Sequence, residues 1–119
     1  MTALMVAATS GSSDRIVKTI LKHDPDMLRT DSSGHTALHW ACKAGKEKHA
    51  KAILAYARQK YKTKPERLFE FIDARTNGGN TAIIFAVQSL EIEVLAHCLR
   101  AGANPFLENS LRQDCLKVA

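Results

Sequence analysis

Three segments of the chain are copies of one six-residue sequence, and this repetition constrains the fold more than any other feature. The copies are Thr-Ala-Leu-Met-Val-Ala at 2–7, Thr-Ala-Leu-His-Trp-Ala at 36–41 and Thr-Ala-Ile-Ile-Phe-Ala at 81–86. A weaker fourth copy, Asp-Cys-Leu-Lys-Val-Ala, occupies 114–119. The copies start 34, 45 and 33 residues apart, so the middle interval holds about twelve residues beyond a period that is typical of stacked repeat units.

Each copy predicts the start of a short helix, because its first residue can accept a backbone N–H two or three positions further on. Gly11 and Gly45 follow the first two copies, where a left-handed residue would end the helix. A second helix is then predicted from apolar residues in i, i+1, i+4, i+5 order. These positions are Ile16, Val17, Ile20 and Leu21 in the first unit, His49, Ala50, Ile53 and Leu54 in the second, and Val94, Leu95, Cys98 and Leu99 in the third.

Helix, turn, helix and hairpin, repeated about every 33 residues, resemble the ankyrin repeat. The segments nearest to that pattern are Asp-Ser-Ser-Gly-His-Thr-Ala-Leu-His-Trp-Ala at 31–41 and Arg-Ala-Gly-Ala-Asn-Pro at 100–105. The resemblance implies an all-α repeat, an ankyrin-type α-solenoid of helix-turn-helix units with hairpin-like turns, in which His39 hydrogen-bonds backbone groups at its turn. We expect a single domain over 1–119. Its parts are repeat 1 at about 1–30, repeat 2 at about 31–57, an insert at about 58–72, repeat 3 at about 73–105 and a partial repeat 4 at about 106–119.

Several positions depart from this pattern. Leu90 stands where a glycine is usual, so it either adopts a left-handed conformation, at about 1–2 kcal/mol, or the third unit bends differently. Arg112 replaces the turn glycine before the fourth copy, which predicts an irregular last hairpin. The last unit lacks a second helix, and we expect either that the chain is a segment of a longer protein or that this half unit caps the third repeat.

The net charge of +5 is concentrated in one stretch. Lys43–Arg67 contains nine basic and two acidic residues, whereas the rest of the chain has eight basic and ten acidic ones. Ala57 stands where Gly102 ends the corresponding helix of the third unit, so the helix is predicted to continue past it. Thr63-Lys64-Pro65-Glu66 is typical of a capping box that starts a new short helix. This basic insert carries Arg58, Lys60, Lys62, Lys64 and Arg67.

Two interpretations of the basic insert compete. In the first it is a solvated extension whose Leu68, Phe69 and Ile72 pack back onto the stack. In the second it is a docking site for an acidic surface, a phosphoprotein or nucleic acid. Nucleic acid is the least expected of these, since no base-reading module accompanies the charge.

Residues with catalytic or metal-binding potential are few. Three cysteines, at 42, 98 and 115, give no disulfide framework and indicate a reducing compartment, which predicts a cytoplasmic or nuclear location, or both. His35, His39 and Cys42 have spacings that could converge on a metal, but no fourth ligand is evident. We therefore expect no enzyme, no metal and no cofactor. No apolar run of the sequence is long enough for a membrane span.

The sequence predicts a non-catalytic scaffold that binds another protein through a concave surface of turns and first helices, as the resemblance implies. Trp40 and Phe85 share one position of the repeated hexamer, so they either pack in the core or give Trp40 a role as a binding anchor. The alternative is a regulatory or targeting segment of a larger, possibly enzymatic protein, or an adaptor that docks acidic partners or nucleic acid through the basic insert. The expected protein-binding residues are Ser32, Ser33, His35, Trp40, Lys43, Asn77, Gly78, Asn80, Gln88 and Ser89.

Overall fold

The structure is a computed structural model that describes residues 2–9, 11 and 14–105. These residues form seven helices and no strand, which confirms the predicted all-α repeat fold. The helices are α1 (Ala3–Thr9), α2 (Arg15–Leu21), α3 (Ala37–Lys43), α4 (Glu47–Lys60), α5 (Pro65–Ile72), α6 (Ala82–Gln88) and α7 (Ile92–Arg100). None of these helices has the length and apolar character that a membrane crossing requires. The expected partial repeat 4, with Arg112 and Cys115, lies outside the described residues.

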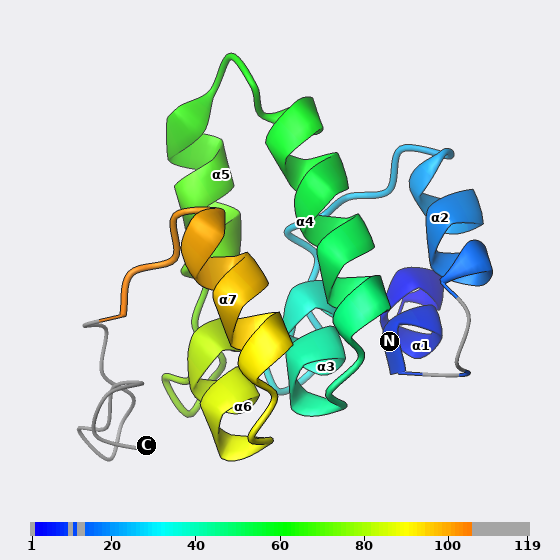
Figure 1. The fold of residues 1–119 in the computed structure, drawn as a ribbon. Coiled ribbons are helices and arrows are strands. Elements are labelled where there is room, and N and C mark those ends of the chain that lie inside the picture. Colours follow the sequence, from blue (N-terminus) through cyan, green and yellow to red (C-terminus); the bar gives the residue numbers. More distant parts are fainter. Residues whose placement is uncertain (1, 10, 12–13, 106–119) are drawn as a thin grey trace.

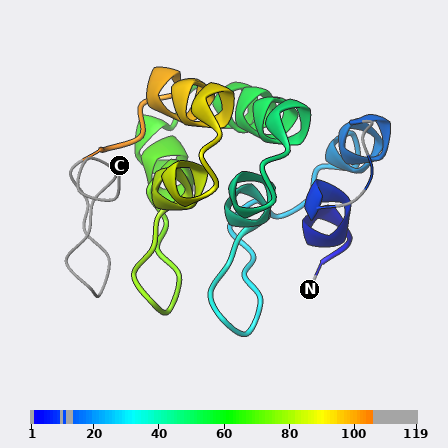
Figure 2. The ribbon, with the colours of Figure 1, turned by 60° about the horizontal axis from the view of Figure 1, so that its bottom comes forward.

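Six of the helices form two parallel rows. The inner row is α1, α3 and α6, and the outer row is α2, α4 and α7 (Figure 1). Within each row neighbouring helices pack against each other, and each inner helix packs against the outer helix that follows it in the chain. The segments before α3 and α6 form hairpin-like loops that project from the same side of the stack (Figure 2).

The inner helices pack closely because the repeated hexamer ends in a small residue. Ala7, Ala41 and Ala86 are all buried, and the alanine side chains leave room for the next helix. Leu38 and Ile83, at the third position of the hexamer, are buried in the same core. The apolar pattern that predicted the helices therefore also fixes the face by which the repeats stack.

The threonines that open the hexamers do not all cap their helices. The Thr2 and Thr36 hydroxyls accept hydrogen bonds from the backbone N–H groups of Met5 and His39 at 3.2 and 3.4 Å. Thr81 precedes α6 in the same extended conformation, but its side chain makes no capping bond. Its Oγ1 is buried without a hydrogen-bond partner among the described residues, so the prediction of a cap was wrong for this repeat.

The turn between α6 and α7 keeps the geometry of its counterpart between α3 and α4 without a glycine. Gly45 has a φ of +68° and Leu90 one of +56°. In both turns the next residue closes the helix, since Lys46 donates to the Ala41 carbonyl at 3.0 Å and Glu91 to the Ala86 carbonyl at 3.1 Å. Leu90 therefore adopts the left-handed conformation, the first of the two alternatives predicted for it. For a residue with a side chain this conformation costs about 1–2 kcal/mol of steric strain.

The basic insert consists of the end of α4, a short turn and α5. As predicted, α4 continues past Ala57 and ends at Lys60. The predicted capping box was wrong: α5 has Lys64 at its N-cap with no side-chain capping bond, and Pro65 takes the first helical position, where its lack of an N–H costs nothing.

Helix α5 packs against the stack through residues only partly foreseen. Ile72 is buried, as expected, but Phe71 is the buried aromatic ring, and Phe69 keeps 48% of its surface exposed. Phe69 lies over Gly102, where an added Cβ would approach its ring to 2.9 Å. The Asp73 carboxylate, at the C-cap of α5, accepts a hydrogen bond from the Asn104 backbone N–H at 2.9 Å, so the end of α5 contacts the end of repeat 3.

Candidate functional site

The loops before α3 and α6 have the same backbone hydrogen bonds. In the first, the Asp31 N–H donates to the His35 carbonyl and the Gly34 N–H to the Asp31 carbonyl, both at 3.0 Å. In the second, the Thr76 N–H donates to the Asn80 carbonyl at 3.0 Å, and the Gly79 N–H to the Thr76 carbonyl at 2.8 Å. The two loops therefore have the same backbone conformation, one repeat apart.

Asn77 joins the two loop tips. Its backbone N–H donates to the Ser33 carbonyl at 2.9 Å, and its side-chain amide donates to the Ser32 carbonyl at 3.1 Å. Gly34 lies beneath this contact with a φ of +82°, and a Cβ on it would come within 2.8 Å of the Asn77 side chain. A glycine is required here both by the backbone conformation and by the close approach of the second loop.

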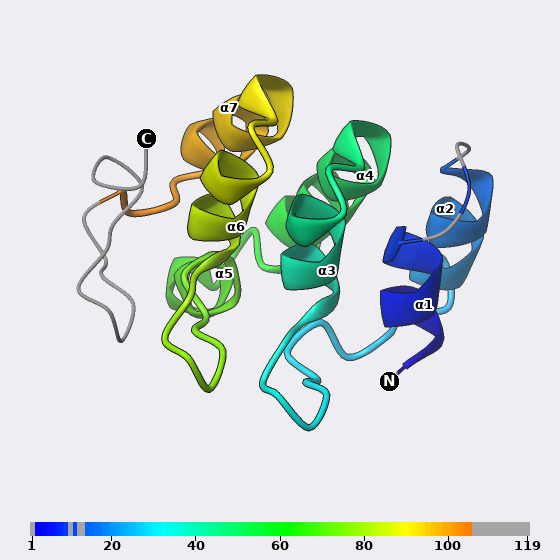
Figure 3. The ribbon, with the colours of Figure 1, turned by 90° about the horizontal axis from the view of Figure 1, so that it is seen from below.

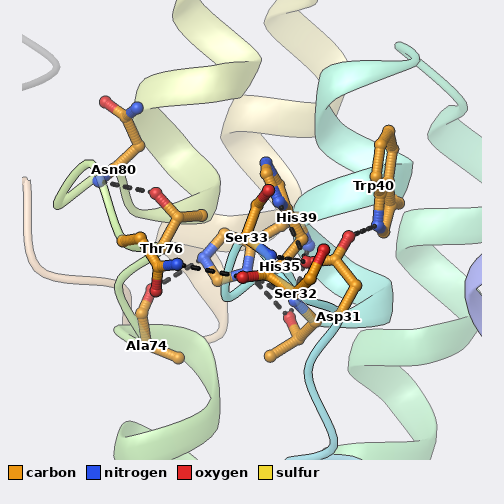
Figure 4. Close-up of polar contacts among 11 residues, drawn as sticks. Asp31, Ser32, Ser33, His35, His39, Trp40, Ala74, Thr76 and Asn80 are labelled. Atoms are coloured by element: carbon orange, nitrogen blue, oxygen red, sulfur yellow. Dashed lines mark hydrogen bonds and ion pairs between the residues drawn. The ribbon is translucent and has the colours of Figure 1, made fainter. Parts of the chain in front are cut away.

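His39 connects repeat 2 to the start of repeat 3 (Figure 4). Its Nδ1 accepts a hydrogen bond from the Thr36 backbone N–H at 2.9 Å, and its Nε2 lies 2.7 Å from the Ala74 carbonyl. Because Nδ1 accepts, the ring proton lies on Nε2 and is donated to Ala74. Burial lowers the pKa of His39 to about 4, so the ring is neutral at physiological pH. The role that the family resemblance implied for His39 is the one that the structure shows.

An aromatic cluster lies between the loops and the inner helices. The His35 ring lies 5.5 Å from the Phe85 ring in a stacked arrangement and 4.9 Å from the Trp40 ring. The Lys43 ammonium is 5.3 Å from the Trp40 ring centroid and 5.6 Å from that of Phe85. Phe85 is buried, whereas Trp40 is half-buried. The Trp40 ring packs against the core and also keeps part of its surface exposed, and its role as a binding anchor stays a prediction.

Asp31 holds the cluster in place from the first loop. One carboxylate oxygen accepts the backbone N–H groups of Ser33 and His35, both at 2.9 Å, and the other accepts the Trp40 indole N–H at 3.0 Å. Burial by itself would raise the pKa of Asp31, but these three donors outweigh it and lower the pKa below its ordinary value. Sequence reasoning missed Asp31, although an aspartate at the start of a tight turn is a common signal for such bonds.

The residues predicted to bind protein lie on the side formed by the loop tips and the inner helices, which we call the concave surface (Figure 3). Six of them are exposed, namely Ser32, Ser33, Lys43, Asn77, Gly78 and Gln88. Four are half-buried, namely His35, Trp40, Asn80 and Ser89. The Ser89 hydroxyl donates to the Lys43 carbonyl at 3.0 Å and so ties the ends of α3 and α6 together.

The basic insert does not present its five cations as one patch. The Lys60 ammonium lies 3.0 Å from the Asp24 carboxylate and donates to the Pro25 carbonyl at 3.0 Å. Tyr56 also hydrogen-bonds Asp24, which has a φ of +52° at the end of the first repeat. Lys60 therefore links the end of α4 to the first repeat. Arg58 lies instead beside Lys51 and Arg100, on the outer face.

No group of three or more potential ligands that could hold a metal ion occurs within 2–9, 11 and 14–105. His39 is already engaged on both ring nitrogens. Cys42 and Cys98 are buried and face each other across α3 and α7, with their sulfur atoms 3.7 Å apart. The contact with Cys98, together with burial, raises the pKa of the Cys42 thiol, so it stays protonated at neutral pH.

Comparison with known proteins identifies the repeat. A family model described as ankyrin repeats, in three copies, matches residues 1–65, which is more than half of the chain. A search of curated proteins gave no match. The pair α6 and α7 lies beyond the matched residues but repeats the packing, the turn and the loop geometry of α3 and α4. The chain belongs to the ankyrin repeat family.

Proposed function

We propose that this chain is a non-catalytic scaffold that binds a partner protein through its concave surface. Ankyrin repeats are generally protein–protein interaction modules, and the family is generally non-catalytic. The finer assignment, to this surface and these residues, rests on how the loops are held. The observation that carries it is the pair of hydrogen bonds from Asn77 to Ser32 and Ser33, which make two loop tips into one surface.

A surface held in this way binds with a smaller loss of conformational entropy than two independent loops would. The hydrogen bond to Asp31 restrains the Trp40 ring, and stacking on Phe85 restrains the His35 ring. Trp40 therefore offers a partner a partly exposed aromatic ring that is already fixed in place, a property shared by residues that dominate binding energy at interfaces. The exposed polar residues around it supply hydrogen bonds at the rim.

The test is binding of the partner by charge-matched variants. Affinity capture from the source cell supplies a partner, which is then purified for titration. The concave variant carries Ser33→Glu, Lys43→Glu and Gln88→Glu, and the control carries Lys62→Glu and Lys64→Glu, so both lower the net charge equally. We expect the concave variant to weaken binding by about tenfold or more, and the control by less than about threefold. The opposite order would assign binding to the basic insert and overturn the proposal.

A further inference from the structure

The outer face of the stack carries a row of cations that the concave surface does not use. Lys48, Lys51 and Arg58 are spaced at three and seven residues along α4, which places them on one side of the helix together with Ala52 and Ala55. Figure 1 looks onto this side, with α4 between α2 and α7. All three cationic residues are exposed.

These side chains line two hollows, one on either side of α4. The first, of about 490 Å³, lies against α2 and is lined by Asp14, Lys18, Lys48, Lys51, Ala52 and Ala55. The second, of about 150 Å³, lies against α7 and is lined mainly by Lys51, Ala55, Arg58, His97 and Arg100. Lys51 and Ala55 line both, so the hollows meet over α4. We call the two together the outer groove.

Most of the positive charge in the outer groove is not neutralised by the chain itself. Lys18 pairs with Asp14 at 3.1 Å, and His97 with Glu47 at 3.3 Å. Lys51, Arg58 and Arg100 have no ion pair within the part of the chain that the structure describes. The groove thus combines several available cations at its rim with alanine methyl groups at its floor.

We propose that the outer groove is a second docking surface, which binds a carboxylate-rich segment of a partner protein. Asp14 already shows this mode of contact, because its carboxylate lies at one end of the groove against Lys18. The Lys18 hydrogen bond keeps the pKa of Asp14 below its ordinary value, so a carboxylate here stays ionised. The proposal does not depend on the concave surface, which lies on the inner row.

The length and lining of the groove favour a peptide. Lys48 and Arg58 are separated by about 15 Å along the helix axis, the span of about five residues of extended chain. Alternate side chains of such a chain point to opposite sides, so one set meets the cations and the other the alanine floor. A nucleic acid strand gains much of its affinity from base stacking on aromatic rings. No phenylalanine, tyrosine or tryptophan lines either hollow, and the one ring there, the His97 imidazole, is already paired with Glu47.

The direct test uses a fluorescein-labelled peptide of about twelve alternating glutamate and alanine residues. Its binding to the whole chain is followed by fluorescence anisotropy at low ionic strength, where charge pairing is least screened. A glutamine–alanine peptide of the same length serves as the uncharged probe. An oligothymidylate and vesicles containing phosphatidylserine, titrated in parallel, compare the other two sources of negative charge.

A charge-matched pair of variants locates the site. The groove variant carries Lys51→Glu, Arg58→Glu and Arg100→Glu, and the control carries Lys62→Glu, Lys64→Glu and Arg67→Glu on the basic insert. All six residues are exposed, so both variants should retain the wild-type helical circular dichroism spectrum.

We expect the groove variant to lose at least about tenfold in affinity for the acidic peptide, and the control to stay within about threefold of wild type. Equal losses in the two variants would show a response to net charge alone and would overturn the proposal. Binding of the glutamine–alanine peptide with the same affinity as the glutamate–alanine peptide would also overturn the proposal. Tighter, groove-dependent binding of the oligothymidylate or of the vesicles would assign the groove to nucleic acid or to a lipid surface instead.

Discussion

His39 provides a sharp test of how the repeats are joined. Replacing it with glutamine keeps a polar side chain of similar length but removes the ring that accepts from the Thr36 N–H and donates to the Ala74 carbonyl. Both of these backbone groups then lose a partner in a largely buried position. At neutral pH we expect His39→Gln to lower the free energy of unfolding by about 2–3 kcal/mol, because unsatisfied buried polar groups cost about 1–3 kcal/mol each and glutamine restores part of the loss.

The effect of this substitution should depend on pH in a defined direction. Burial lowers the pKa of His39 from 6.5 to about 4 in the folded chain. Below pH 6.5 the unfolded chain therefore takes up a proton at this site that the folded chain does not. The stabilising contribution of neutral His39 is complete above pH 6.5 and is lost as the pH falls toward 4. Between pH 7.5 and 4.5 this loss amounts to about 2.5 kcal/mol.

The assay is urea unfolding of both proteins, followed by far-ultraviolet circular dichroism at a series of pH values between these limits. The other histidines are the same in both proteins, so the difference between the two curves isolates His39. We expect the difference to shrink by about 2.5 kcal/mol from pH 7.5 to 4.5. A constant difference at all pH values would refute the reasoning, because it would mean that folding leaves the pKa of His39 unchanged.

Three further predictions concern the caps and turns, each checked by equilibrium unfolding in urea. Thr36→Val should lower the free energy of unfolding by about 1–2 kcal/mol, whereas Thr81→Val should leave it unchanged or raise it, since of these two hydroxyls only that of Thr36 caps a helix. Equal losses in the two variants would contradict this. Leu90→Gly should stabilise the chain by about 0.5–1 kcal/mol, because relief of the left-handed strain exceeds the entropy that glycine adds to the unfolded chain, and a loss of stability would contradict this. Gly102→Ala should lower the free energy of unfolding by about 1–2 kcal/mol. If the loss is similar in a Phe69→Ala background, the backbone φ of +104° causes more of it than the contact with the Phe69 ring does.

Local features of the fold were predictable because they arise within a few residues of the chain. The threonine that opens each hexamer and the apolar spacing predicted where α3 and α6 begin, and the glycine after the helix predicted where α3 ends. These signals recur at a fixed period, so they also predicted the stacking of the repeats. The continuation of α4 to Lys60 followed from the lack of a helix-ending residue at Ala57.

The same reasoning failed where two equivalent sequences have different surroundings. Thr2, Thr36 and Thr81 open similar hexamers, but only the Thr2 and Thr36 hydroxyls cap their helices. Thr2 does so with Met5 three positions later and Thr36 with His39, so the residue at that position does not explain why Thr81 makes no cap. In α5 the period of the apolar residues does not distinguish Phe69 from Phe71 as the buried ring. The packing of α5 makes that choice, since it buries Phe71 in the core and lays Phe69 over Gly102, about 30 residues further along the chain.

The candidate binding surfaces likewise combine features that local sequence patterns predict with features that only the packing of the helices produces. The repeat, the order of its helices and the residues at its loop tips follow from the sequence alone, because a periodic pattern of apolar, capping and turn residues acts over short range. Three other features become visible only in the folded chain: Asn77 holds Ser32 and Ser33, Lys60 contacts Asp24, and Arg58 shares a groove with Arg100. These contacts join residues 35 to 45 or so positions apart, and they depend on how far each helix extends and how it packs on the next, which no local pattern specifies.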